Sequence, residues 1–129
     1  MPLFFRATPV LAALAVLGAC VTATEANEAL PSALEAGWKG EPVCELRHQT
    51  STHRVLKCSF APGVGHERHF HPAHFGYALS GGTMKLTDGR GDRVAEIATG
   101  SSYSSDGVEW HQVVNVGDTT VTYLIVEEL

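Results

Sequence analysis

From Gly40 to the C-terminus, apolar and polar residues alternate over short stretches and do not recur at the spacing of a helix. The stretches are rich in β-branched and aromatic residues, and the turn compositions APG, TDGRGD, ATGSS and NVGD separate them. They are residues 43–48, 53–60, 74–81, 82–87, 93–98 and 119–129. At least six short strands predict an all-β fold, either an antiparallel sandwich or a barrel.

The segment from Cys44 to Cys58 predicts a hairpin, because it alternates on both sides of a polar turn. If the turn is centred on Ser51, residue 44 pairs with 58 and residue 47 with 55. Directly opposed cysteines on antiparallel strands can approach disulfide distance. In an oxidising compartment we expect a Cys44–Cys58 disulfide; the alternative is two small buried thiols in the wall of the fold.

The first 19 residues have the pattern of a signal peptide, with one arginine and an apolar run over residues 10–18 that is too short to span a bilayer. The four residues Leu17-Gly18-Ala19-Cys20, at the end of this run, resemble the lipobox of bacterial lipoproteins, in which the cysteine is lipidated. Cleavage near Ala23 or Ala26 would instead release a protein without an anchor. Both alternatives predict export, to the periplasm or as a membrane-anchored lipoprotein, and the lipobox favours the second.

The 129 residues suffice for one domain. Residues 20–39 are small, polar and acidic, which is typical of a tether. The sequence after Pro31 is compatible with a short helix. Residues 40–129 form the predicted domain. The net charge of −5 and the lack of Lys/Arg clusters argue against a nucleic-acid partner. The partners we expect are a small molecule and, at most, a second chain in a homodimer, with membrane contact only through an anchor at Cys20.

Histidine is the unusual part of the composition: there are seven, of which five lie between His53 and His74. His69 and His71 are two residues apart, so on a strand their imidazoles project from the same face. Two imidazoles make half of a transition-metal site. A site therefore needs a further ligand, distant in sequence, that the fold brings close.

The spacing around these histidines resembles the first motif of the cupin family, which reads glycine, five residues, His-x-His, three or four residues, glutamate, six residues, glycine. Gly63, His69, His71 and Gly81 match it. Counting back from Gly81, the glutamate position is occupied by His74. No glutamate lies between Glu67 and Glu96.

The second cupin motif is matched in part by Gly100, His111 and Asn115, while Asp106 and Val108 stand where proline and glycine are usual. Asn115 is expected to support the turn that follows it. The resemblance covers residues 43–127 or so. It implies a single-domain cupin, a jelly-roll β-barrel, with a divalent metal held by His69, His71 and His111.

His74 has two readings: it replaces the carboxylate as a fourth metal ligand, or it points elsewhere and leaves three histidines with open coordination positions. Neutral imidazoles leave the metal charge uncompensated, which favours anionic substrates or polarised water. Fe, Ni, Cu, Zn and Mn all accept imidazole, and an all-nitrogen set shifts the preference from Mn towards Cu, Ni or Zn. A barrel that has lost its metal and keeps the histidines as polar lining is the other interpretation.

Residues beside the histidines carry further expectations. Glu109 is in register with His111 on a regular strand, so it is our candidate catalytic base, a partner of a ligand, or an ordinary rim carboxylate. Trp110 then faces away from the metal. His66 is expected to be peripheral, facing solvent or supporting a ligand. With His74 facing inward, Gly76 and Ala78 do so too and leave volume for a ligand or relieve crowding.

These residues favour an exported enzyme that acts on a small oxygen-rich molecule through a His-ligated metal, of dioxygenase, isomerase or lyase type. The alternative is a module that binds a metal or small ligand without turnover. The fold cannot decide between them, because cupins carry many unrelated activities.

Lipidation is tested by labelling cells that express the protein with palmitate. We expect label in the parent chain and none in Cys20→Ser, because the thiol is the acceptor. A parent without label, or a variant that keeps it, contradicts the lipoprotein prediction.

Overall fold

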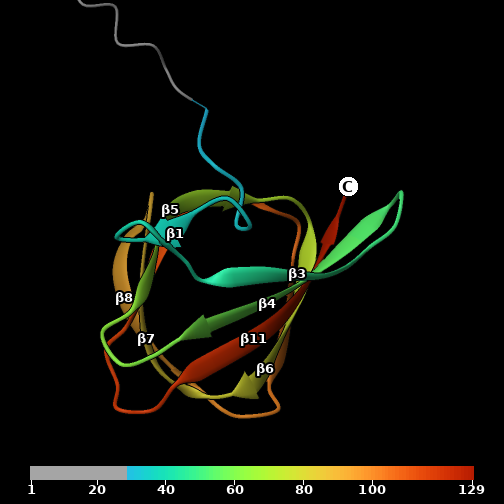
Figure 1. The fold of residues 1–129 in the computed structure, drawn as a ribbon. Coiled ribbons are helices and arrows are strands. Elements are labelled where there is room, and N and C mark those ends of the chain that lie inside the picture. The colour runs from blue at the N-terminus through green and yellow to red at the C-terminus, as the bar shows by residue number, and fades with distance from the viewer. Residues whose placement is uncertain (1–28) are drawn as a thin grey trace, which may run out of the picture.

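The computed structural model describes residues 29–129, so the predicted signal peptide, Cys20 and the start of the tether lie outside the described residues. The described chain is built of strands joined by turns (Figure 1). The strands are β1 (Gly37–Trp38), β2 (Glu41–Pro42), β3 (Cys44–Gln49), β4 (His53–Phe60), β5 (Gly65–His71), β6 (His74–Ser80), β7 (Gly82–Asp88), β8 (Gly91–Ile97), β9 (Ser102–Ser105), β10 (Val108–Asn115) and β11 (Val121–Glu128). Each of the six predicted strands is present, which confirms the all-β fold.

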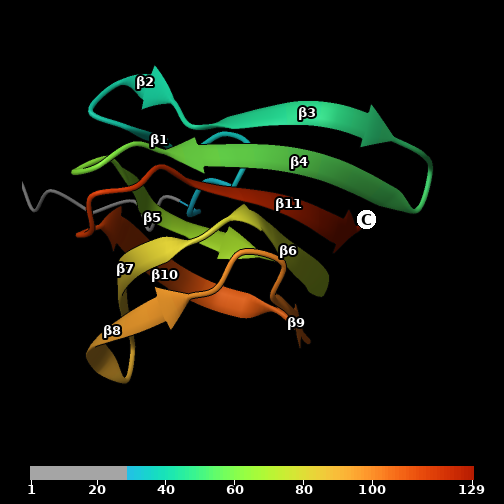
Figure 2. The same ribbon diagram turned by 90° about the horizontal axis from the view of Figure 1, so that it is seen from below.

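Two antiparallel sheets face each other across the interior (Figure 2). One has the order β5-β10-β7-β8 and the other β3-β4-β11-β6-β9. Consecutive strands such as β4 and β5, or β6 and β7, belong to different sheets, as in a jelly roll. The sheets do not close into one hydrogen-bonded barrel, so the expected barrel is a sandwich.

The hydrophobic core lies between the two sheets, because inward residues alternate with outward ones along their strands. On β6, for example, Gly76 and Ala78 are buried while Tyr77 is exposed. The core cluster contains Ala33, Cys44, Leu56, Cys58, Phe60, Met84, Val113, Val121 and Ile125. It fills one part of the interior, and histidines occupy another.

The β3–β4 hairpin pairs Cys44 with Cys58, as predicted, and the two residues form a disulfide. The predicted pairing of residues 47 and 55 is wrong, because the register shifts between Leu46 and His48 and places His48 opposite Val55. A one-residue bulge of this kind adds a residue to one strand only, and the sequence alternation does not announce it.

The helix considered after Pro31 is a single turn, in which the Glu35 and Ala36 amides both donate to the Ser32 carbonyl. Ser32 forms a bridge with Phe70 of β5, and Ala33 is fully buried in the core. Part of the predicted tether therefore packs as the start of the domain. Within residues 29–129, no helix has the length and hydropathy needed to cross a membrane.

Asn115 supports the turn after β10, as predicted. Its Nδ2 donates to the carbonyls of Phe60 at 2.8 Å and Thr119 at 2.7 Å, and its Oδ1 accepts from the Gly117 amide at 3.0 Å. The side chain is buried, so these bonds satisfy polar atoms that would otherwise be costly to bury. They hold the end of β10 in place relative to both sheets.

Replacing Cys44 and Cys58 by serine should lower the free energy of unfolding by about 3 kcal/mol, the entropy expected for freeing a loop of this length. The bridged residues are 14 apart in sequence. Urea unfolding of the parent and the double variant measures the difference, and a reductant should destabilise only the parent. Equal unfolding curves, or free thiols at both positions in the unreduced parent, would contradict the prediction.

Candidate metal centre

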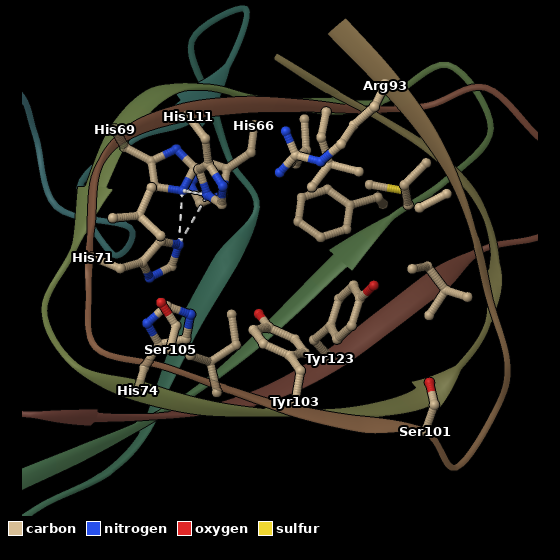
Figure 3. A pocket seen from close by; sticks show the side chains of 18 of the residues that line it. His66, His69, His71, His74, Arg93, Ser101, Tyr103, Ser105, His111 and Tyr123 are labelled. Carbon is tan, nitrogen blue, oxygen red and sulfur yellow. Dashed lines mark hydrogen bonds between the residues drawn. The ribbon is translucent and has the colours of Figure 1, made fainter. Parts of the chain in front are cut away.

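Three histidines converge between the sheets at the β5–β10 pair (Figure 3). His69 and His71 are both buried on the same face of β5, as their spacing predicts. His111 lies on β10 directly opposite His69. A register shift between Val108 and His111 adds a residue to β10 and turns His111 onto the face that His69 and His71 share.

The Nε2 atoms of His69, His71 and His111 lie 3.0 to 3.1 Å from one another. Nitrogen ligands at about 2.1 Å from one metal are roughly 3 Å apart, so this triangle has the size that a shared metal requires. The three rings meet edge to face at interplanar angles of 71° to 89°. The three histidines could therefore hold one metal ion.

The hydrogen bonds of the opposite ring nitrogens show why these rings suit a cation. His69 Nδ1 donates to the Glu67 carbonyl at 2.5 Å, and His71 Nδ1 donates to the Glu127 carboxylate at 2.6 Å. When both rings are neutral and each carries its one proton on Nδ1, both Nε2 atoms present lone pairs to the space between them. In this state the two Nε2 atoms could both coordinate one metal ion.

Glu127, on the last strand, is the functional residue that the sequence analysis missed. Its side chain is fully buried, with Oε1 on His71 and Oε2 accepting from Arg54 Nε at 2.5 Å. Burial alone would raise the pKa of Glu127, but the hydrogen bonds from His71 and Arg54 outweigh it and lower the pKa. One feature of the sequence could have indicated Glu127: it is an acidic residue at an inward position of a strand, next to a second glutamate.

Burial favours the neutral form of His69 and His111. It lowers the pKa of His69 to about 2 and that of His111 to about 3, with neighbouring imidazoles adding to the effect. Both values lie far below the ordinary range of histidine. Protons therefore compete weakly with a metal for these two nitrogens at neutral pH.

His66 is buried beside the site, so the expectation that it faces solvent is wrong and the supporting role is correct. Its ring stacks on His69 at a centroid distance of 3.7 Å, and its Nε2 donates to the Ala33 carbonyl at 2.9 Å. A second register shift, between His111 and Val113, places an extra residue in β5 between His66 and His69. His66 and His69 can therefore both face inward although they are three residues apart.

His74 faces inward on β6, as expected, but lies outside the group of three. Its Nδ1 donates to the Pro72 carbonyl at 2.9 Å, and its ring stacks against His71 at 4.6 Å. Burial lowers the pKa of His74. The structure brings His74 beside a ligand, and its role as a fourth ligand stays a prediction.

Glu109 is not beside the histidines: it is exposed and borders a separate depression near Pro72. The bulge that aims His111 inward breaks the alternation from which we placed Glu109 inward. Trp110 does face away from the site, as predicted, and its ring lies 4.0 Å from the Arg68 guanidinium carbon in a cation–π contact.

A cavity of about 480 Å³ adjoins the three histidines. Tyr103 and Tyr123 line it, and burial raises the pKa of both, that of Tyr123 to about 12, so their hydroxyls stay protonated at neutral pH. Gly76 leaves room for a side chain and not for a ligand: a Cβ there would lie 2.3 Å from the Tyr103 ring. The absence of a side chain at Gly76 thus positions Tyr103 in the cavity wall.

Comparisons with known proteins agree with this architecture. The family model described as Cupin domain matches residues 56–127. A cupin domain protein from Bordetella pertussis is similar at 20% identity, with a TM-score of 0.64, 78% of this chain covered and 96% of that one. The polyketide cyclase RemF from Streptomyces resistomycificus has 21% identity, a TM-score of 0.55 and coverages of 74% and 73%. No protein of curated function matches the chain.

Replacing Glu127 by glutamine should weaken metal binding roughly 10- to 100-fold, the usual effect of altering the partner of a ligating histidine. Glutamine keeps the size of the side chain but removes the charge that His71 and Arg54 share. Competition with a chromophoric chelator measures the dissociation constant. Glu128→Gln, at the adjacent exposed position, is the matched control. Equal affinities in parent and Glu127→Gln would contradict the role of Glu127.

Proposed function

This chain belongs to the cupin family, and we propose that it is an enzyme that binds one divalent transition metal through His69, His71 and His111 and acts on a small molecule in the adjoining cavity. The observation that carries the proposal is the triangle of Nε2 atoms, which lie 3.0 to 3.1 Å from one another. A metal there would supply a Lewis acid or a binding site for oxygen ligands.

The open side of the triangle supports turnover. Three nitrogen ligands leave coordination positions free, and His71 and His111 both line the cavity of about 480 Å³. A small molecule in that cavity would reach the metal without displacing a protein ligand. Tyr103 and Tyr123 can donate hydrogen bonds to it through hydroxyls that remain protonated.

A non-catalytic binding module is the second candidate. It is favoured by one observation: the part of the chain that the structure describes places no aspartate or glutamate on the cavity wall. The carboxylate proposed as a base, Glu109, lies outside. If there is proton transfer, it would fall to His74 or a tyrosine; otherwise the site holds a ligand without turnover.

We also propose that the protein is exported, through the signal peptide predicted over residues 1–19. The Cys44–Cys58 disulfide supports export, because such bonds persist in oxidising compartments. An anchor at Cys20 would keep the domain at the membrane, and cleavage further along would release it.

Elemental analysis of the purified protein should find about one divalent metal per chain, because the site has ligands for one ion. His69→Ala and His111→Ala should lose it, and His53→Ala, at an exposed position, should keep it. Metal that remains in both ligand variants would overturn the site. Metal-dependent conversion of a small molecule would support the enzyme, and binding without conversion would support the binding module.

The same measurements decide the role of His74. Because His74 is outside the group of three, we expect His74→Ala to keep its metal. X-ray absorption of the loaded parent should then give three imidazole ligands. Loss of metal in this variant, with a fourth imidazole in the parent, would make His74 a ligand.

A further inference from the structure

The wall of the cavity is strongly unbalanced in charge. It includes Arg90, Arg93 and five histidines, whereas none of its described residues is acidic. Glu127, the nearest buried carboxylate, is already shared between His71 and Arg54. Neutral imidazoles add nothing to compensate a divalent metal, so a loaded site would be cationic and would favour an anion.

Arg93 brings a positive charge into the cavity. On β8 it pairs with Leu86 of β7, so that it faces inward with Ala95 and Ile97. Its side chain extends towards His66 and His111 in Figure 3. Its charge also contributes, after burial and the neighbouring imidazoles, to the lowered pKa of His111.

Only part of the Arg93 guanidinium is hydrogen-bonded to other residues. Its Nη1 donates to Asp88 Oδ2 at 2.7 Å, and the same Oδ2 accepts from Arg90 Nη2 at 3.0 Å. One carboxylate therefore serves two guanidiniums and leaves one positive charge in excess. Within residues 29–129, no acceptor takes up Nε or Nη2 of Arg93, so both are available to a ligand.

The rest of the wall is suited to hydrocarbon. Between Arg93 and the tyrosines it is formed by apolar side chains of both sheets, namely Phe60, Met84, Leu86, Ile97, Val113 and Ile125. A ligand with polar groups along its body would leave them without partners against these side chains. Away from the histidines and arginines, the polar groups of the wall are uncharged hydroxyls, from Ser101, Ser102, Tyr103, Ser105 and Tyr123.

We propose that the cavity binds an organic monocarboxylate with an apolar, ring-sized body, whose carboxylate lies between the three-histidine group and the Arg93 guanidinium. The two free N–H groups of Arg93 match one carboxylate, since a guanidinium binds a carboxylate through paired donors. The inference rests on the proposed function and deepens it by naming the substrate class.

The test uses the zinc-loaded full chain and follows binding by NMR titration, with benzoate as the probe and benzamide as its neutral isostere. We expect benzoate to bind at least about tenfold more tightly than benzamide, because a charged hydrogen bond is lost in the amide. Arg93→Gln should weaken benzoate binding about tenfold, leave benzamide unchanged and keep the metal. Arg47→Gln, on exposed β3, is the control and should change neither.

Metal content, circular dichroism and probe affinity are measured on the same samples, so that the two proposals fail separately. A folded parent that binds no metal overturns the metal site, and Arg93-dependent binding of benzoate in the chelator-treated protein would still support the present inference. Equal affinities for benzoate and benzamide, or an unaltered benzoate affinity in folded Arg93→Gln, overturn it. Tighter binding of inorganic phosphate than of benzoate would overturn the assignment of a carboxylate.

Discussion

The backbone ladder between β5 and β10 is the interaction on which the candidate site depends. Two register shifts in this ladder decide which side chains face the interior. One turns Glu109 away from the face that His111 shares with His69, and the other adds His66 behind them. Without the shifts, strict alternation would turn Glu109 inward and His66 outward. The two shifts thus leave the Glu109 carboxylate outside the interior and place the His66 imidazole inside it.

The second determinant is the buried charge of Glu127, which links the two sheets. β11 supplies the carboxylate, β5 supplies His71 and β4 supplies Arg54. His74 stands where the first cupin motif usually has a glutamate, and none of the described residues that line the cavity is acidic. Glu127 delivers a negative charge to the same region through the His71 ring. The negative charge beside the histidines therefore comes from β11, a strand far from the first cupin motif in the sequence.

The sequence analysis predicted the parts of the structure that follow from regular alternation. The six strands, the shared face of His69 and His71, and the Cys44–Cys58 pair all depend on a period of two. His111 was predicted from the spacing of the second cupin motif. The orientation of Glu109 and His66 could not be predicted, since a bulge leaves no composition signal in a single sequence. Glu127 was missed because its role arises from contacts with His71 and Arg54 on other strands.

The disulfide has a consequence for how this domain meets other chains. β3 is an edge strand that pairs only with β4, and beyond Cys44 all its residues are exposed (Figure 2). Without the disulfide, β3 would be held by its ladder with β4 alone, and fraying of β3 would uncover the backbone of β4, whose inward residues Leu56, Cys58 and Phe60 are apolar. An open apolar edge is a template for pairing with a second molecule. The redox state around the protein therefore affects how firmly β3 covers β4 against pairing with a second molecule.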